Sequence, residues 1–158
     1  MHIDLLIRAA ALLTVLGTGV VYGTDVFCAM VLRPALARVD DQTLVTTIGY
    51  VHRYADRRMP VPGVLGILAA AASVVTATVA GHTMQALAAG TALAALLIWL
   101  LIYTRLSAPI NRRLTAAAET GRLLPNGRAL QATWDSVINA RAALQGLAVA
   151  TACAVLLT

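Results

Sequence analysis

Long apolar stretches alternate with two arginine-rich segments along this chain of 158 residues. Four of the stretches are each within reach of the roughly 20 residues that cover the ~30 Å hydrocarbon core of a bilayer. The pattern therefore predicts an all-α fold, a membrane-embedded four-helix bundle that takes up the whole chain, residues 1–158, as one domain. The predicted spans are residues 5–32, 61–80, 86–103 and 142–158.

The positive charges of the chain are placed unevenly. All 12 Lys and Arg residues are arginines, and all but Arg8 fall within residues 33–58 and 105–141. The turn expected at residues 81–85, between the second and third spans, carries no formal charge. Because Lys and Arg in loops near span ends favour the cytoplasmic side, we expect both arginine-rich segments in the cytoplasm and both termini outside the cell membrane.

Parts of the arginine-rich segments are themselves predicted to be helical. The aspartate pair at 40–41 can cap a helix over residues 42–57. In the second segment we expect a helix to restart near Pro109, a break over residues 121–127, and a last helix that runs from Arg128 into the fourth span. The bundle should therefore carry helical extensions on its cytoplasmic side.

The composition supports the membrane class and limits the partners. Hydrophobic residues make up 59% of the chain and charged residues 12%, against the ~25% charged residues of soluble domains. The formal charge of +5 does not indicate a nucleic-acid partner, because the arginines flank the spans instead of forming a patch interleaved with aromatic residues. We expect them to contact membrane lipid. The sequence leaves a homo-oligomer open.

Asp25 is the only carboxylate well inside a predicted span. A carboxylate there costs roughly 2.5–3.5 kcal/mol on insertion scales unless it is paired or hydrated. Two interpretations stay open: Asp25 forms an ion pair with an arginine of the two segments, or it acts as a base or proton acceptor in a cavity that faces the cytoplasm. In the second case Tyr22, one turn earlier on the same helix, would contact a substrate.

A histidine and a carboxylate lie four residues apart in the first arginine-rich segment. His52 and Asp56 would share one face of the predicted helix. Such a pair can orient a base or supply two metal ligands. Two ligands do not make a metal site, so the sequence defines none. A surface or lipid-facing position for His52 is the alternative.

Aromatic, amide and cationic side chains gather where the last span begins. Trp134, Ile138 and Arg141 occupy positions i, i+4 and i+7 of one predicted helix, and Asn139 lies on a neighbouring face. With Asn111, they suit a planar molecule that bears oxygen atoms: the indole can stack, the amides can donate or accept, and the guanidinium can stabilise a developing oxyanion. An interfacial tryptophan beside a snorkelling arginine is the structural alternative.

Three sequence elements carry a resemblance to a known family. They are the run Arg-Pro-Ala-Leu-Ala-Arg-Val-Asp-Asp at 33–41, the Pro-x-Asn-x-x-Leu pattern at 109–114, and Trp134 with Asn139 and Arg141 entering the last span. In order and spacing, over nearly the whole chain, the sequence resembles a family of small four-helix membrane proteins, largely of unknown function, that includes the anthrone oxygenases. These enzymes convert anthrones to anthraquinones. By position, the resemblance implicates Asn111, Trp134, Asn139 and Arg141.

We therefore expect a membrane oxygenase or oxidoreductase that acts on a lipophilic aromatic substrate, anthrone-like or quinol-like, at the cytoplasmic membrane interface. The sequence requires no cofactor and leaves a haem or a metal ion open. Two alternatives remain: a non-enzymatic module that binds or transports a small solute or protons, and a structural subunit of a membrane complex. The predicted catalytic residues are Asp25, His52 and Arg141, and the predicted substrate contacts are Tyr22, Asn111, Trp134 and Asn139.

The orientation can be tested by labelling single cysteines from each side of intact cells. A cysteine placed near Gly127 should react only with reagent that has reached the cytoplasm, because all arginines but Arg8 lie in the two segments expected there. A cysteine in the uncharged turn at 81–85 should react from outside. Labelling near Gly127 from the outer side alone would overturn this topology.

Overall fold

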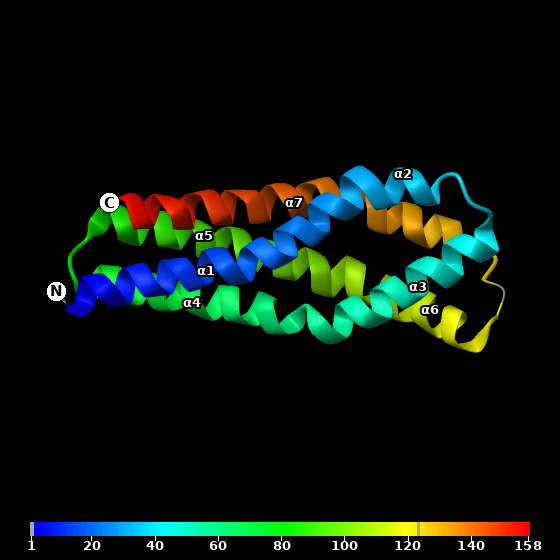
Figure 1. Cartoon of the computed structure of the whole chain (residues 1–158), viewed down its shortest axis with the longest axis horizontal. Coiled ribbons are helices and arrows are strands. Elements are labelled where there is room, and N and C mark those ends of the chain that lie inside the picture. Colours follow the sequence, from blue (N-terminus) through cyan, green and yellow to red (C-terminus); the bar gives the residue numbers. More distant parts are fainter. Residues whose placement is uncertain (1, 123) are drawn as a thin grey trace.

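The computed structural model describes residues 2–122 and 124–158, and its regular elements are helices (Figure 1). The first half comprises α1 (His2–Phe27), the π-helical turn η1 (Cys28–Leu32), α2 (Arg33–Leu36), α3 (Asp41–Arg58) and α4 (Pro60–Val79). The second half comprises α5 (Thr83–Ile102), the π-helical turn η2 (Tyr103–Ser107), α6 (Ala108–Thr120) and α7 (Gly127–Leu157). The predicted all-α fold is confirmed.

Four helical segments of the described chain are long and apolar enough to cross a membrane, as predicted. They extend beyond the predicted limits where the helix continues past the apolar residues without a break. In Figure 1 both termini and the α4–α5 turn lie at one end of the bundle, and α2, α3 and α6 lie at the other. The four segments are His2–Leu36, Pro60–Val79, Thr83–Thr120 and Gly127–Leu157.

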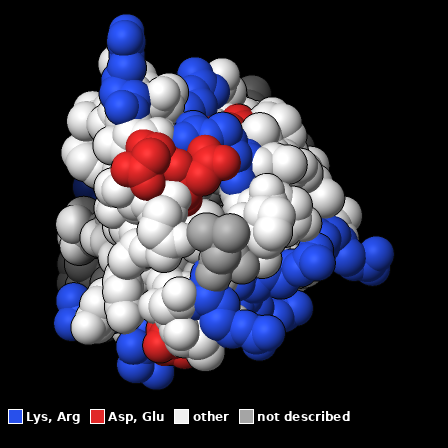
Figure 2. All heavy atoms as spheres, turned by 90° about the vertical axis from the view of Figure 1, so that its right-hand side faces the viewer, with Lys and Arg blue, Asp and Glu red and all other residues white. Residues whose placement is uncertain are grey.

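The end of the bundle formed by α2, α3 and α6 contains the predicted helical extensions. Figure 2 views this end and shows arginine side chains around its edge. α3 packs along α6, and Leu44, Ile48 and Leu114 are buried between the extensions and the start of α7. The extensions therefore have a hydrophobic core of their own, which continues the bundle past the apolar spans.

Local signals in the sequence set the ends of these helices. Asp40 caps α3: its carboxylate accepts hydrogen bonds from the backbone N–H of Thr43 at 2.9 Å and from the Thr43 hydroxyl at 2.7 Å. Met59 separates α3 from α4, which starts at Pro60. α6 ends at Thr120 and is capped by Gly121, whose φ of +62° lies in the left-handed region that glycine adopts without strain.

The expected helix restart near Pro109 is instead a π-helical turn inside one continuous helix. η2 ends two residues before Pro109, and η1 ends two residues before Pro34. A proline ring clashes with the carbonyl four residues earlier and offers no N–H to it, and the wider π turn accommodates both effects. The helices therefore run on through both prolines. The π turns also place Cys28 and Ser107 in the interior.

α1 and α4 approach each other closely at two glycines. A Cβ atom added at Gly17 would lie 2.7 Å from the carbonyl oxygen of Pro62 and 2.8 Å from the backbone nitrogen of Gly66. Small residues allow such contacts between membrane helices. Gly19, two residues along the same helix, has nothing within 4 Å of its Cβ position. The close approach therefore depends on Gly17 and not on Gly19.

Replacing Gly17 with alanine should destabilise the protein by roughly 1–3 kcal/mol, because the added methyl group overlaps the α4 backbone. Gly19→Ala is the matched control: it should leave stability unchanged or raise it by up to about 1 kcal/mol through better helix propensity. Thermal unfolding in detergent, followed by circular dichroism, measures both. Equal unfolding temperatures for the two variants would contradict this packing.

Candidate functional site

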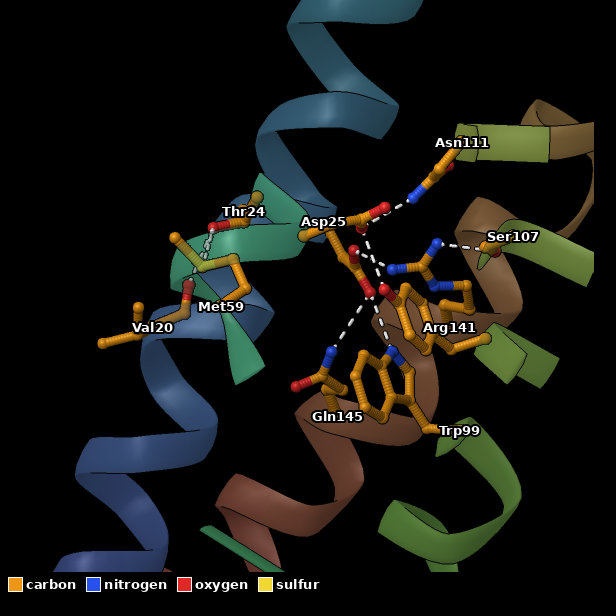
Figure 3. Close-up of polar contacts among 11 residues, drawn as sticks. Val20, Thr24, Asp25, Met59, Trp99, Ser107, Asn111, Arg141 and Gln145 are labelled. Atoms are coloured by element: carbon orange, nitrogen blue, oxygen red, sulfur yellow. Dashed lines mark hydrogen bonds and ion pairs between the residues drawn. The ribbon is translucent and has the colours of Figure 1, made fainter. Parts of the chain in front are cut away.

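A buried ion pair joins α1 to α7 in the middle of the bundle. Asp25 Oδ1 accepts a hydrogen bond from Arg141 Nη2 at 2.8 Å, and its Oδ2 accepts from Trp99 Nε1 and Gln145 Nε2, each at 3.1 Å. Arg141 Nη1 donates to Ser107 Oγ at 2.9 Å. Both charged side chains are almost fully buried, and Figure 3 shows these groups pointing toward one another. The ion pair, one of the two interpretations of Asp25, is observed, and the role of Asp25 as a base stays a prediction.

Three aromatic rings surround the Arg141 guanidinium group. Its central carbon lies 5.0 Å from the ring centroid of Trp134, 5.7 Å from that of Trp99 and 5.8 Å from that of Tyr103. Trp99 and Tyr103 stack on each other with centroids 5.6 Å apart. Ring faces attract cations, and a desolvated contact of this kind is worth about 2 kcal/mol. The rings therefore help to hold a cation away from water.

A second carboxylate lies nearby with neutral partners. Asp56 Oδ1 accepts hydrogen bonds from the Tyr103 hydroxyl at 2.8 Å and from Asn111 Nδ2 at 2.9 Å. The sequence placed His52 and Asp56 on one helix face and suggested that they act as a pair. In the structure, Asp56 connects α3 to η2 through Tyr103 and to α6 through Asn111.

His52 is buried beside Trp134, with ring centroids 5.2 Å apart and planes tilted by 47°. The predicted alternative of a surface or lipid-facing histidine is therefore wrong. Burial lowers the pKa of His52 to about 4, although the nearby Asp56 carboxylate and Gln131 amide oppose the shift. The ring is neutral at pH 7. Its Nε2 atom has no hydrogen-bond partner among the described residues.

These groups line a cavity of about 180 Å³ to which α1, α3, α4, α5, η2, α6 and α7 contribute residues. Most of the remaining wall is aliphatic, which favours an apolar occupant. The apolar lining includes Val21, Val51, Val64, Ile67 and Leu100, and the polar and aromatic lining includes Asp25, His52, Asp56, Trp99, Tyr103, Asn111, Trp134 and Arg141.

Buried polar atoms without partners are concentrated around this cavity. Apart from Arg53 Nε, which is ion-paired with Glu119, seven buried side-chain nitrogen and oxygen atoms of the described residues have no hydrogen-bond partner, and four of these belong to residues that line it. An unsatisfied buried polar group typically costs about 1–3 kcal/mol, so each of the four calls for an explanation. The four are His52 Nε2, Asn111 Oδ1, Trp134 Nε1 and Arg141 Nε.

Two predicted site residues lie elsewhere. Asn139 is exposed, because a residue two positions from Arg141 points to nearly the opposite side of the helix. Tyr22 packs against α7, where its Cε2 atom would lie 3.2 Å from a Cβ added at Gly146. Neither lines the cavity. The other five predicted residues do come together around it: Asp25, His52, Asn111, Trp134 and Arg141.

The sequence prediction missed a stripe of residues on the third span. Trp99, Tyr103, Ser107 and Asn111 recur every four residues, so they share one face of the continuous helix. This spacing is the signal that could have revealed the first three. Gln145 follows Arg141 at the same interval and joins the same cluster. No group of three His, Cys, Asp or Glu side chains that could hold a metal ion occurs among the described residues.

Comparisons with known proteins give no match. A scan against protein-family models, a search of curated proteins and a search of solved structures each returned nothing similar to this chain. The resemblance to the anthrone oxygenase family therefore stays a prediction from the sequence. What the protein does must be inferred from the cavity and the residues around it.

Replacing Arg141 with methionine should destabilise the protein by roughly 3–5 kcal/mol, because it leaves Asp25 charged and buried without its cation. The double variant Asp25→Asn/Arg141→Met should lose markedly less than the sum of the two single losses, since neither charge is then left alone. Unfolding of purified protein by SDS titration measures all three variants. Additive losses would show that the two side chains are not coupled.

Proposed function

We propose that this protein is a membrane oxygenase that oxidises a lipophilic aromatic substrate, anthrone-like or quinol-like, in the cavity beside the ion pair. The observation that carries the proposal is a largely apolar cavity whose lining includes four residues that each carry a buried polar atom without a hydrogen-bond partner among the described residues. A molecule with an apolar body and oxygen atoms along one edge would fit both features. Its body would contact the aliphatic lining, and its oxygen atoms would form hydrogen bonds with the four polar atoms. The resemblance found in the sequence supports the same substrate class.

The unpartnered atoms match the oxygen atoms of a hydroxylated aromatic ketone. Trp134 Nε1 and Arg141 Nε are donors that a carbonyl oxygen can accept from. Asn111 Oδ1 is an acceptor that a phenolic hydroxyl can donate to. The aliphatic side chains opposite would contact the rings. Tight packing and hydrogen bonding at one edge would together orient the substrate.

His52 is the proposed base, although burial makes it a weak one, so stabilisation of the substrate anion has to assist the proton transfer. Its Nε2 has no hydrogen-bond partner in the described part of the chain and the ring is neutral at pH 7, whereas Asp25 accepts from three donors that include the Arg141 guanidinium. His52 would take a proton from the acidic C–H opposite the ketone of an anthrone. Arg141 and Trp134 would stabilise the negative charge that develops on the ketone oxygen. Asp25 then serves to hold Arg141 in place.

The rest of the reaction needs only oxygen. The substrate carbanion adds dioxygen, and the resulting peroxide loses water to give the quinone. One anthrone and one dioxygen thus yield one anthraquinone and one water, with the substrate as the only electron donor. The proton that His52 removed leaves in that water.

The proposed location is the cytoplasmic half of a cell membrane, with both termini outside. The arginine distribution supports this orientation. The cavity is lined in part by His52 and Asp56 of α3 and by Asn111 of α6, the helices at the arginine-rich end of the bundle, so it would be within reach of molecules dissolved in the cytoplasmic leaflet. Toward the termini the interior is filled by small residues such as Ala11, Ala77 and Ala89.

Oxygen uptake tests the proposal. Purified protein in lipid nanodiscs should consume one dioxygen per molecule of a hydroxylated anthrone, above the uncatalysed rate. Replacing His52 with glutamine should lower this rate by about 10²-fold or more, because the base is removed. As the pH falls from 7, wild-type activity should drop only near about 4, where His52 takes up a proton.

His82→Gln is the matched control for the histidine substitution. His82 lies in the α4–α5 turn at the other end of the bundle, where its Nδ1 is 2.9 Å from Gln85 Oε1. This variant should keep full activity. Saturable binding of the anthrone without oxygen uptake would favour the non-catalytic binding or transport module. A protein that neither binds nor oxidises it would favour a structural subunit.

A further inference from the structure

An open groove follows the outer face of α3 and adjoins the cavity. The groove has a volume of about 530 Å³, and Tyr50, Tyr54 and Arg58 lie along it. Three further residues, Val51, Ala55 and Met59, line both the groove and the cavity. The two spaces therefore meet at these three side chains, which we call the neck.

Met59 is the movable part of the neck. It lies at the joint between α3 and α4, outside both helices. Its sulfur lies 3.8 Å from Thr24 Oγ1 on α1, a weak contact because the Thr24 hydroxyl also donates to the Val20 carbonyl oxygen at 2.9 Å (Figure 3). Methionine has three rotatable bonds and no branch, so it changes conformation easily. A rotation of this side chain would change the width of the neck.

The outer side of the groove suits a membrane surface. Tyr54 is 50% exposed and Val51 is 37% exposed, and Val64, on the rim of the cavity, is 54% exposed. These residues lie where the candidate span Pro60–Val79 begins, the level at which amphipathic aromatic side chains are enriched. The Arg58 guanidinium carbon lies 5.3 Å from the Tyr54 ring centroid. The Arg58 guanidinium therefore supplies a positive charge to a groove whose lining is otherwise mostly apolar.

We infer that the groove on α3 is an access site, where a lipophilic molecule with an anionic or oxygen-bearing end leaves the bilayer and passes the neck into the cavity. The apolar body would lie against Val51 and Tyr54, and Arg58 would hold the polar end. Met59 would open and close the neck. The inference rests on the proposed function only in taking the ligand to be lipophilic, and no reaction is needed.

Tryptophan fluorescence can follow passage through the neck. The chain has 2 tryptophans, and both Trp99 and Trp134 line the cavity. A suitable probe is 6-bromo-2-naphthol, a planar molecule with one hydroxyl group and a bromine atom that quenches indole emission. Added to the protein in lipid nanodiscs, it should quench both tryptophans. Aqueous iodide should quench them little, because both side chains are buried.

Variants of the neck decide the route. Ala55→Phe should slow stopped-flow quenching about tenfold, the change that roughly 1.4 kcal/mol of added barrier produces. Met59→Ala should accelerate it. A damaged fold could also accelerate quenching, but it would then increase quenching by iodide as well. Val61→Phe is the control, since Val61 is exposed at the start of α4 and lines neither space. Its quenching rate should equal that of wild type.

The access route is wrong if Ala55→Phe and Met59→Ala are quenched at the wild-type rate, or if the naphthol does not quench wild type at all. Should Ala55→Phe fail to fold, the rate for Met59→Ala alone decides. Failure here is distinct from failure of the proposed oxygenase. If Ala55→Phe slows quenching but the wild-type protein takes up no oxygen, the access site stands and the reaction is rejected. If the wild-type protein takes up oxygen but the neck variants are quenched at the wild-type rate, the reaction stands and the access site is rejected.

Discussion

The ion pair between Asp25 and Arg141 is the constraint on which the middle of this bundle depends. Removing two charges from water costs several kcal/mol per ion unless good geometry and further hydrogen bonds compensate for the lost hydration. Here Trp99 and Gln145 complete the shell of the carboxylate, and Ser107 binds the guanidinium. These contacts fix α1, α5 and α7 relative to one another, together with the π turn that carries Ser107.

The same constraint shapes the cavity. Three aromatic rings lie around the Arg141 guanidinium. With Arg141, they line part of a cavity whose other lining residues are mostly aliphatic. The two carboxylates near the cavity differ in their partners: Asp25 faces a cation, and Asp56 faces the neutral donors of Tyr103 and Asn111. The neutral His52 also lines the cavity, and its Nε2 has no hydrogen-bond partner among the residues that the structure describes. That combination gives the proposed site one available base and one fixed cation.

The sequence was sufficient for the architecture and for part of the site. Apolar length predicted the spans, the aspartate pair predicted the cap of α3, and the spacing of Trp134 and Arg141 predicted their shared face, because each of these signals is local to one helix. The resemblance and the polar character of Asn139 suggested a site residue, but helix phase puts it on the exposed side. Helix phase is readable from sequence only once the inward face is known.

Contacts between helices were less accessible to sequence reasoning. The partner of Asp25 lies 116 residues away in the chain, and nothing local to Asp25 distinguishes Arg141 from the other arginines. Asp56 likewise accepts hydrogen bonds from Tyr103 and Asn111 and not from His52, because of where η2 and α6 place those two residues. The stripe that begins at Trp99 was readable as a period of four, yet its interior position follows from packing against α7.

The most direct test of the central claim, that a bound molecule satisfies the polar atoms of the cavity, is the indole NMR spectrum of ¹⁵N-labelled protein in detergent. The 2 tryptophans give two indole signals. Trp99 Nε1 already donates to Asp25, whereas Trp134 Nε1 has no hydrogen-bond partner within residues 2–122 and 124–158. Addition of a hydroxylated anthrone under nitrogen should move the Trp134 signal downfield, as expected for a new hydrogen bond, and leave the Trp99 signal nearly in place. An unchanged Trp134 signal at saturating anthrone, or a shift of the Trp99 signal alone, would contradict the claim.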